Sequence, residues 1–112
     1  MAESSSFAID SQLQADTARM TVAGELDIAT VGQLEAEVGT VLARGVRELI
    51  LDLSGLTFID SSALRLFIVL NDRAAGEDWQ LSLIRPAGAA MSIFQISGAE
   101  EHLPFIDDPE AQ

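Results

Sequence analysis

The sequence has 112 residues, 48% of them hydrophobic and 21% charged, as expected for a single globular domain with one modest core. Its formal net charge is −12, from 18 acidic and 6 basic residues, so it lacks the clustered cations that neutralise phosphates at a nucleic-acid interface. No apolar run approaches the ~20 residues of a membrane-spanning helix, and residues 1–10 lack the features of a signal peptide. We therefore expect a cytoplasmic protein that neither binds nucleic acid nor inserts directly into a membrane.

The residue types that are absent exclude several chemistries. The chain has no cysteine, which excludes disulfides, thiol nucleophiles and cysteine-ligated metals. All six basic residues are arginine, whereas P-loop, Schiff-base and kinase sites each need a lysine. The single histidine, His102, would have to be the base of any Ser-His-Asp hydrolase site, but the sequence has no G-x-S-x-G motif. Without cysteines, a metal site would need His102 together with several carboxylates. We expect His102 at the surface or at a helix end, and no cofactor.

Hydrophobic spacing predicts two strands and a helix in the first part of the chain. Apolar residues alternate over 7–13 and again over 20–26, and the polar QADTA between them is typical of a turn. The following ATVGQLEAEVGTVLARG has its apolar residues at helical spacing. Thr30 and Gln33 have the spacing of a capping box at the start of this helix, and Gly45 suits its end.

The rest of the chain alternates strands and helices. RELILDLSG is apolar on both faces, which is typical of a central strand covered on both sides. The spacing of apolar residues predicts a helix from Ser62 to about Ala75 and the next strand at WQLSLI. Pro86 then suits the start of a third helix, AAMSIFQIS, which ends at Gly98, and LPFI is a possible last strand. The residues of the second helix that can face a sheet are Leu64, Phe67, Ile68 and Leu70.

The element order ββαβαβα predicts an α/β fold. Two adjacent strands followed by alternating helices and strands imply a mixed sheet of four to five strands with three to four helices. We expect one domain over residues 1–112, with a core from about residue 7 to 107. The ends, including the tail DDPEAQ, are expected to be solvated and flexible.

Three carboxylates stand near the ends of predicted strands: Asp27, Asp52 and Asp60. Because ligands bind at the carboxyl ends of strands in α/β sheets, these residues could converge on a magnesium ion and a phosphate. In the simpler alternative, Asp27 and Asp60 accept backbone N–H groups at helix starts, and Asp52 only ends a strand. The missing lysine, the usual counter-charge of phosphate, favours the structural alternative.

The segment FIDSSALRLF places polar residues between two apolar runs. If Asp60 or Ser61 is the N-cap of the helix, Ser62 lies in its first turn, where free N–H groups and the helix dipole tolerate negative charge. A phosphate there would add roughly −1.5 to −2 units of charge without disrupting the helix. This face of the helix is either a contact patch gated by the serine or the border of the core. The residues that share the face with Ser62 are Arg65, Leu66 and Val69.

Three segments resemble the STAS domain of bacterial anti-sigma factor antagonists: GELDIAT, LILDLSGLTFIDSSAL and SGAEEHLPFID. The resemblance extends from about Phe7 to Asp107. It implies a STAS fold and a non-enzymatic protein that binds an anti-sigma factor serine kinase and so releases a sigma factor. It also implies that the kinase phosphorylates Ser62, that the phosphorylated form dissociates, and that a phosphatase resets it.

The same resemblance implies that Asp27, Asp60 and Ser61 line the surface presented to the kinase. Ala63 stands where family members commonly have glycine, and we expect its methyl group to narrow the approach of a partner. Together with the stripe of Arg65, Leu66 and Val69, these residues form the expected partner surface. An alternative within the family is an accessory subunit of a transporter or signalling complex that has no phospho-switch.

Overall fold

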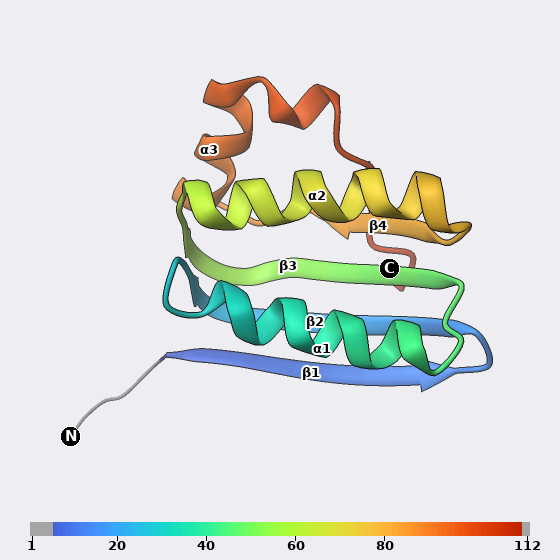
Figure 1. Cartoon of the computed structure of the whole chain (residues 1–112). Coiled ribbons are helices and arrows are strands. Elements are labelled where there is room, and N and C mark those ends of the chain that lie inside the picture. The colour runs from blue at the N-terminus through green and yellow to red at the C-terminus, as the bar shows by residue number, and fades with distance from the viewer. Residues whose placement is uncertain (1–5, 111–112) are drawn as a thin grey trace.

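The computed structural model describes residues 6–110, which form a five-stranded sheet with helices packed against it (Figure 1). Its elements follow the predicted order ββαβαβα, so the expected α/β fold is confirmed. They are β1 (Phe7–Gln14), β2 (Thr17–Leu26), α1 (Val31–Ala43), β3 (Glu48–Ile59), α2 (Ser61–Glu77), β4 (Gln80–Ile84), α3 (Ala89–Ser97), the 3-10 helix η1 (Ala99–Glu101) and β5 (Phe105–Ile106). The outermost residues, for which flexibility is expected, lie outside the described range. None of the helices within that range is both long and apolar enough to cross a membrane.

The sheet has the strand order β1-β2-β3-β4-β5, with β1 antiparallel to β2 and all other neighbours parallel. The register pairs Gln14 with Thr17, so Ala15 and Asp16 form the turn predicted at QADTA. Because β2, β3 and β4 are parallel, their carboxyl ends meet at one edge of the sheet. This topology brings the segments that follow β2 and β3 together.

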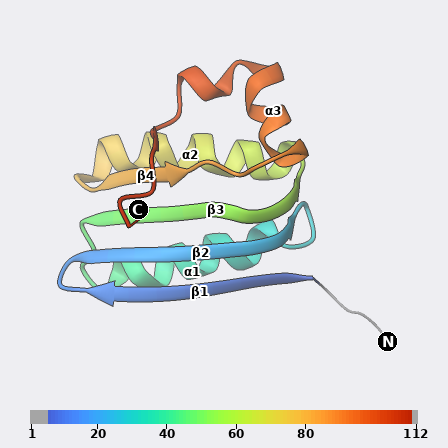
Figure 2. The ribbon, with the colours of Figure 1, turned by 180° about the vertical axis from the view of Figure 1, so that it is seen from behind.

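Helices α1 and α2 both cover the same face of the sheet (Figures 1 and 2). The expectation that β3 is covered on both faces is therefore wrong. Its alternate residues Ile50 and Asp52 point to the other face, where Ile50 is only half-buried. β3 is central because it lies between β2 and β4, and one layer of helices covers it on a single face. The fully buried residues between sheet and helices include Met20, Val22, Leu34, Val38, Leu49, Leu51, Phe67, Leu70 and Leu83.

Helix α3 packs near the amino-terminal end of α2 (Figure 1). The ring of Phe94 lies 5.9 Å from that of Phe67 in α2 and 5.2 Å from that of Phe105 in β5, measured between centroids. These aromatic contacts join the last helix and strand to the main core. Gly98, with φ of 80°, ends α3 as predicted, but the helix begins at Ala89, so Pro86 lies in the preceding loop.

An ion-pair network occupies the face of the sheet that the helices leave open. The Arg19 guanidinium donates to Asp52 Oδ2 at 2.7 Å and to both carboxylate oxygens of Asp108, at 2.9 and 3.1 Å. The hydrogen bond from Arg19 lowers the pKa of the Asp108 carboxyl, and the bond to Asp108 raises the pKa of Arg19. In the tail that is expected to be solvated, Asp107, Pro109 and Glu110 are exposed, whereas Asp108 is held by Arg19 where the C-terminal segment crosses the sheet (Figure 2).

Strand β3 departs from regular pairing on its way to the carboxyl edge. Its register with β2 shifts between Thr21 and Ala23 and again between Gly24 and Glu25. At the first shift, Asp52 Oδ1 accepts the Ser54 N–H at 3.0 Å and the Ser54 hydroxyl at 2.7 Å. Bulges of this kind bend a strand and increase its twist. The bend is visible in Figure 1, where β3 curves towards the start of α2.

Candidate functional site

Asp60 is the N-cap of α2 and connects that helix to the β2–α1 loop. Its Oδ1 accepts the N–H groups of Ser62 at 2.9 Å and Ala63 at 3.2 Å. Its Oδ2 accepts the N–H of Ile28 at 3.1 Å, and its own N–H donates to the Leu26 carbonyl at 3.3 Å. The predicted capping role of Asp60 is confirmed, and one carboxylate fixes two segments that are 32 residues apart.

The loop between β2 and α1 is organised by Asp27 and Thr30. Asp27 Oδ1 accepts the Ala29 N–H at 2.9 Å, while the Thr30 hydroxyl donates to the Glu25 carbonyl at 2.9 Å. Asp27 thus caps its own loop, as the structural alternative predicts. The predicted capping box is wrong, because Thr30 is in the αR conformation and its hydroxyl is used within the loop. Ile28, at the tip, is 75% exposed.

A groove of about 280 Å³ lies between α1 and α2, at the amino-terminal end of α2. Ser62 lies at this groove and is half-buried, and within residues 6–110 no side chain or backbone group hydrogen-bonds its hydroxyl. The side of the groove formed by α2 is the stripe predicted from helical spacing. The lining residues are Ile28, Val31, Glu35, Ser62, Arg65, Leu66 and Val69.

The rotation of α2 differs in part from the prediction. Phe67 faces the sheet as expected, but Ile68 is 43% exposed, so the expectation that Ile68 faces the sheet is wrong. Leu66 is only 6% exposed and Val69 is 40% exposed, so Leu66 belongs to the core as well as to the groove. The buried face of the helix follows a wide stripe, and residues at its border serve both surfaces.

Ala63 lies inside the protein. Its exposed fraction is 0%, and its side chain belongs to the hydrophobic core. The methyl group is therefore not at the surface, and its expected effect on the approach of a partner stays a prediction. Of the residues expected at the partner surface, Ser61 and Arg65 are exposed and Asp27 and Asp60 are half-buried.

The three carboxylates considered as a magnesium site do not converge. Asp52 lies in the middle of β3 and binds Arg19 on the face away from the helices, whereas Asp60 lies at the carboxyl edge, eight residues further on. At about 3.3 Å per strand residue, this separation is at most roughly 26 Å. Among residues 6–110, no three histidine or acidic side chains are grouped as metal ligands would be. His102 is exposed directly after η1, as expected.

Sequence reasoning missed the contribution of α1 to this site. Ile28, Val31 and Glu35 line the groove, yet nothing in their local pattern marks them as neighbours of Ser62. The available signal is topological: parallel β2 and β3 place α1 beside α2 on one face of the sheet.

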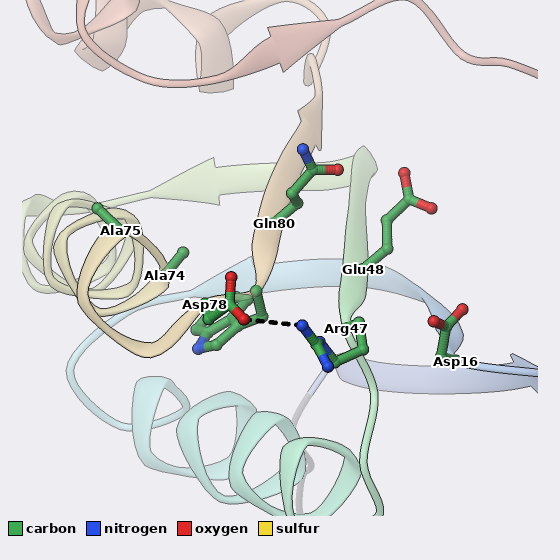
Figure 3. Close-up of a pocket in the computed structure, with 8 residues that line it drawn as sticks. Asp16, Arg47, Glu48, Ala74, Ala75, Asp78 and Gln80 are labelled. Atoms are coloured by element: carbon green, nitrogen blue, oxygen red, sulfur yellow. Dashed lines mark hydrogen bonds and ion pairs between the residues drawn. The ribbon is translucent and has the colours of Figure 1, made fainter.

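A larger hollow of about 550 Å³ lies at the other end of α2 (Figure 3). At this hollow, Arg47 and Asp78 form an ion pair at 2.8 Å, with side chains 60% and 92% exposed. Such solvent-exposed pairs contribute little stability. Its nearest lining residue on α2, Ala74, is 12 residues from Ser62, about 18 Å along the helix, so this hollow forms no part of the Ser62 site.

The chain matches the family model described as "Mlab, STAS domain" over residues 9–106. A Bordetella bronchiseptica protein named "Putative anti-sigma factor antagonist BtrV" is 30% identical over 88 residues, which are 79% of this chain and 76% of that protein. The anti-sigma-B factor antagonist of Staphylococcus aureus is 26% identical over 91 residues, covering 81% of this chain and 84% of its own length.

Solved structures agree with these relationships. The unphosphorylated anti-sigma factor antagonist SpoIIAA superposes with a TM-score of 0.76 at 25% identity, covering 92% of this chain and 90% of that one. The phosphorylated form of Bacillus SpoIIAA superposes with a TM-score of 0.69 at 25% identity, covering 92% and 93%. The chain therefore belongs to the STAS domain family, the family of the bacterial anti-sigma factor antagonists.

Proposed function

We propose that the protein is an anti-sigma factor antagonist whose binding to an anti-sigma factor serine kinase is switched off by phosphorylation of Ser62. The unphosphorylated form occupies the kinase and thereby frees a sigma factor. The phosphorylated form dissociates, and a phosphatase restores it. In this proposal the protein acts in the cytoplasm and catalyses no reaction itself.

One observation carries this proposal: Ser62 lies in the first turn of a capped helix, at a groove, and within residues 6–110 its hydroxyl has no hydrogen-bond partner. The Asp60 cap keeps the backbone of this turn in place whether or not the hydroxyl is modified. A modification of Ser62 therefore changes the charge of the surface without removing a hydrogen bond of the fold. Support also comes from the relatives named antagonists and from SpoIIAA, which is solved with and without phosphate.

The partner surface in this proposal combines polar and apolar groups at one edge of the sheet. Ile28 is 75% exposed and Val69 is 40% exposed, and both line the groove beside Ser62. Ser61 and Arg65 add exposed polar groups on α2. A central apolar patch with a polar surround is the usual composition of a protein interface. Phosphate at Ser62 would place charge that needs hydration inside that patch.

The test begins with phosphate transfer. The anti-sigma factor kinases of the source organism are purified and incubated with the protein and ATP, and any phosphate is located by mass spectrometry. We expect one phosphate, on Ser62, and none on the Ser62→Ala variant. Phosphate at another residue, or none with every kinase, would contradict the assignment of Ser62.

Binding is then measured by calorimetry with the kinase that reacts. Ser62→Asp should weaken binding by at least about tenfold, a change of about 1.4 kcal/mol. Thr40→Asp is the matched control, because Thr40 is exposed on α1 and lies outside the groove. Equal binding by both variants would reject the phospho-switch and favour a constitutive accessory subunit, the alternative function for this family.

A further inference from the structure

Arg65 has an unusual electrostatic position in this acidic protein. Four of the six arginines, Arg19, Arg47, Arg73 and Arg85, form ion pairs with carboxylates. Within residues 6–110, Arg65 has no such partner, although the net charge of the chain is −12. Arg65 is exposed and, among the residues that the structure describes, is the only cation that lines the groove beside Ser62.

Arg65 and Ser62 are neighbours on the surface of α2. They are three residues apart, a spacing that puts Cβ atoms about 5 to 6 Å apart on a helix. Both line the same groove, so their side chains face the same space. The arginine side chain is long enough for its guanidinium to reach a group attached to the serine oxygen. Leu66, 6% exposed, anchors this part of the helix against the core.

The backbone at the start of α2 offers little to a phosphate on Ser62. The N–H groups of Ser62 and Ala63 already donate to Asp60 Oδ1, at 2.9 and 3.2 Å. Phosphate could use these donors only by displacing Asp60, which would also release the Ile28 N–H from Asp60 Oδ2. A phosphate that leaves the Asp60 cap in place therefore cannot use the N–H groups of Ser62 and Ala63, and a side-chain donor is the alternative.

The charges around Ser62 lead to the same conclusion. Asp60 lies next to Ser62 in the capped turn, and Glu35 faces the groove from α1. Both carboxylates oppose the second negative charge of a phosphate. Arg65 is the one lining residue that can offset them, and a guanidinium forms bidentate hydrogen bonds with phosphate oxygens.

We propose that Arg65 is the receptor for the phosphate on Ser62, binding it across one turn of α2. The inference rests on the proposed function, since it assigns the group that receives the modification. Phosphorylation then changes the partner surface in two ways: it adds negative charge at Ser62, and it occupies the cationic side chain of Arg65. A carboxylate of the partner that pairs with Arg65 in the unphosphorylated state loses that contact.

The test uses full-length protein with phosphoserine installed at position 62 by genetic encoding, so that no kinase is required. Phosphorus NMR over a pH series reports the second ionisation of the phosphate, which lies near pH 6 without neighbours. Arg65→Gln should raise this midpoint, with a gain of about three- to tenfold in proton affinity, because the dianion loses its cation. Arg65→Lys keeps the charge and should recover most of the original midpoint.

Arg44→Gln is the matched control. Arg44 has no ion-pair partner among the described residues either, but it lies beyond the end of α1, outside the Ser62 groove. The Arg44→Gln variant should leave the midpoint of the phosphate titration within about 0.2 pH units of its original value. An equal change for Arg44→Gln and Arg65→Gln would overturn the proposal, as would no change for Arg65→Gln. Neither result bears on kinase recognition, so a failure of this inference is distinguishable from a failure of the phospho-switch.

Discussion

Asp60 and Ile28 are joined by a hydrogen bond between a helix cap and a neighbouring loop. Asp60 Oδ2 accepts the Ile28 N–H at 3.1 Å, while Oδ1 of the same carboxylate caps α2. The most exposed apolar residue of the β2–α1 loop is thereby held next to Ser62. The geometry explains why an aspartate precedes the two serines: it fixes both sides of the surface that we assign to the partner.

Replacing Asp60 should destabilise the protein. Asp60→Ala removes the cap, which is worth about 1 kcal/mol, and leaves the Ile28 N–H without its acceptor, which costs about 0.5 to 1.5 kcal/mol more. Urea denaturation should therefore show a loss of about 1.5 to 2.5 kcal/mol in the free energy of unfolding. Asp72→Ala is the control, because Asp72 is exposed further along α2. Equal losses in the two variants would contradict the double role of Asp60.

A negative charge at Ser62 should leave the fold almost unchanged. The hydroxyl has no hydrogen-bond partner within residues 6–110, and the helix dipole favours an anion in the first turn. Repulsion from Asp60 offsets part of that gain. Ser62→Asp should therefore change the free energy of unfolding by less than about 1 kcal/mol, the range of most surface substitutions. A larger loss would mean that weaker partner binding by this variant reflects unfolding rather than a switch.

Much of the fold could be predicted because local patterns and topology agree. The spacing of apolar residues predicts every main element, and Asp60 and Gly98 mark the ends of helices by their chemistry. The groove could not be read from local sequence, since Ile28 and Glu35 reach Ser62 only through the packing of α1 against α2.

The position of Asp52 shows a second limit of sequence reasoning. Its partner Arg19 is 33 residues away, and a strand that continues through SGLTFI places Asp52 in mid-strand rather than at an end. Turn-like residues such as Ser54 and Gly55 suggest the end of a strand, but here they accommodate a bulge. The convergence of three carboxylates was therefore a plausible pattern with the wrong geometry.

The contact between Arg19 and Asp108 should be sensitive to acid. The hydrogen bond from Arg19 lowers the pKa of Asp108 below the value of about 3.9 found in unfolded chains. A lowered pKa in the folded state contributes stability that is complete above about pH 4 and is lost as the pH falls through the folded pKa. Carbon NMR of the Asp108 carboxyl should give a titration midpoint below 3.9.

The Arg19→Gln variant tests the cause of that shift. Its Asp108 midpoint should move upward, towards the value of an unpaired aspartate, because the main donor is gone. Arg73→Gln is the control, since Arg73 pairs with Glu77 on α2 and not with the tail. An Asp108 midpoint that is the same in the protein and in Arg19→Gln would show that the C-terminal segment is not held by Arg19 in solution.

Gly24, the first residue of GELD, should tolerate no side chain. Its φ of 99° favours glycine, and an added Cβ would lie 1.5 Å from the Ser6 carbonyl oxygen, which accepts the Glu25 N–H at 3.1 Å. Gly24→Ala should therefore lower the free energy of unfolding by at least about 2 kcal/mol, because of backbone strain and displacement of the start of β1.

Gly39→Ala is the control with the opposite expected sign. Gly39 lies within α1, and an added Cβ would contact nothing within 4 Å, so alanine should stabilise the helix by about 0.5 to 1 kcal/mol. Thermal unfolding of the two variants should shift in opposite directions, because the same added methyl group is forced into backbone at one site and into solvent at the other. If Gly24→Ala unfolds at the temperature of the original protein, the close approach of β2 to Ser6 is not maintained, and the glycine of GELD has no structural requirement.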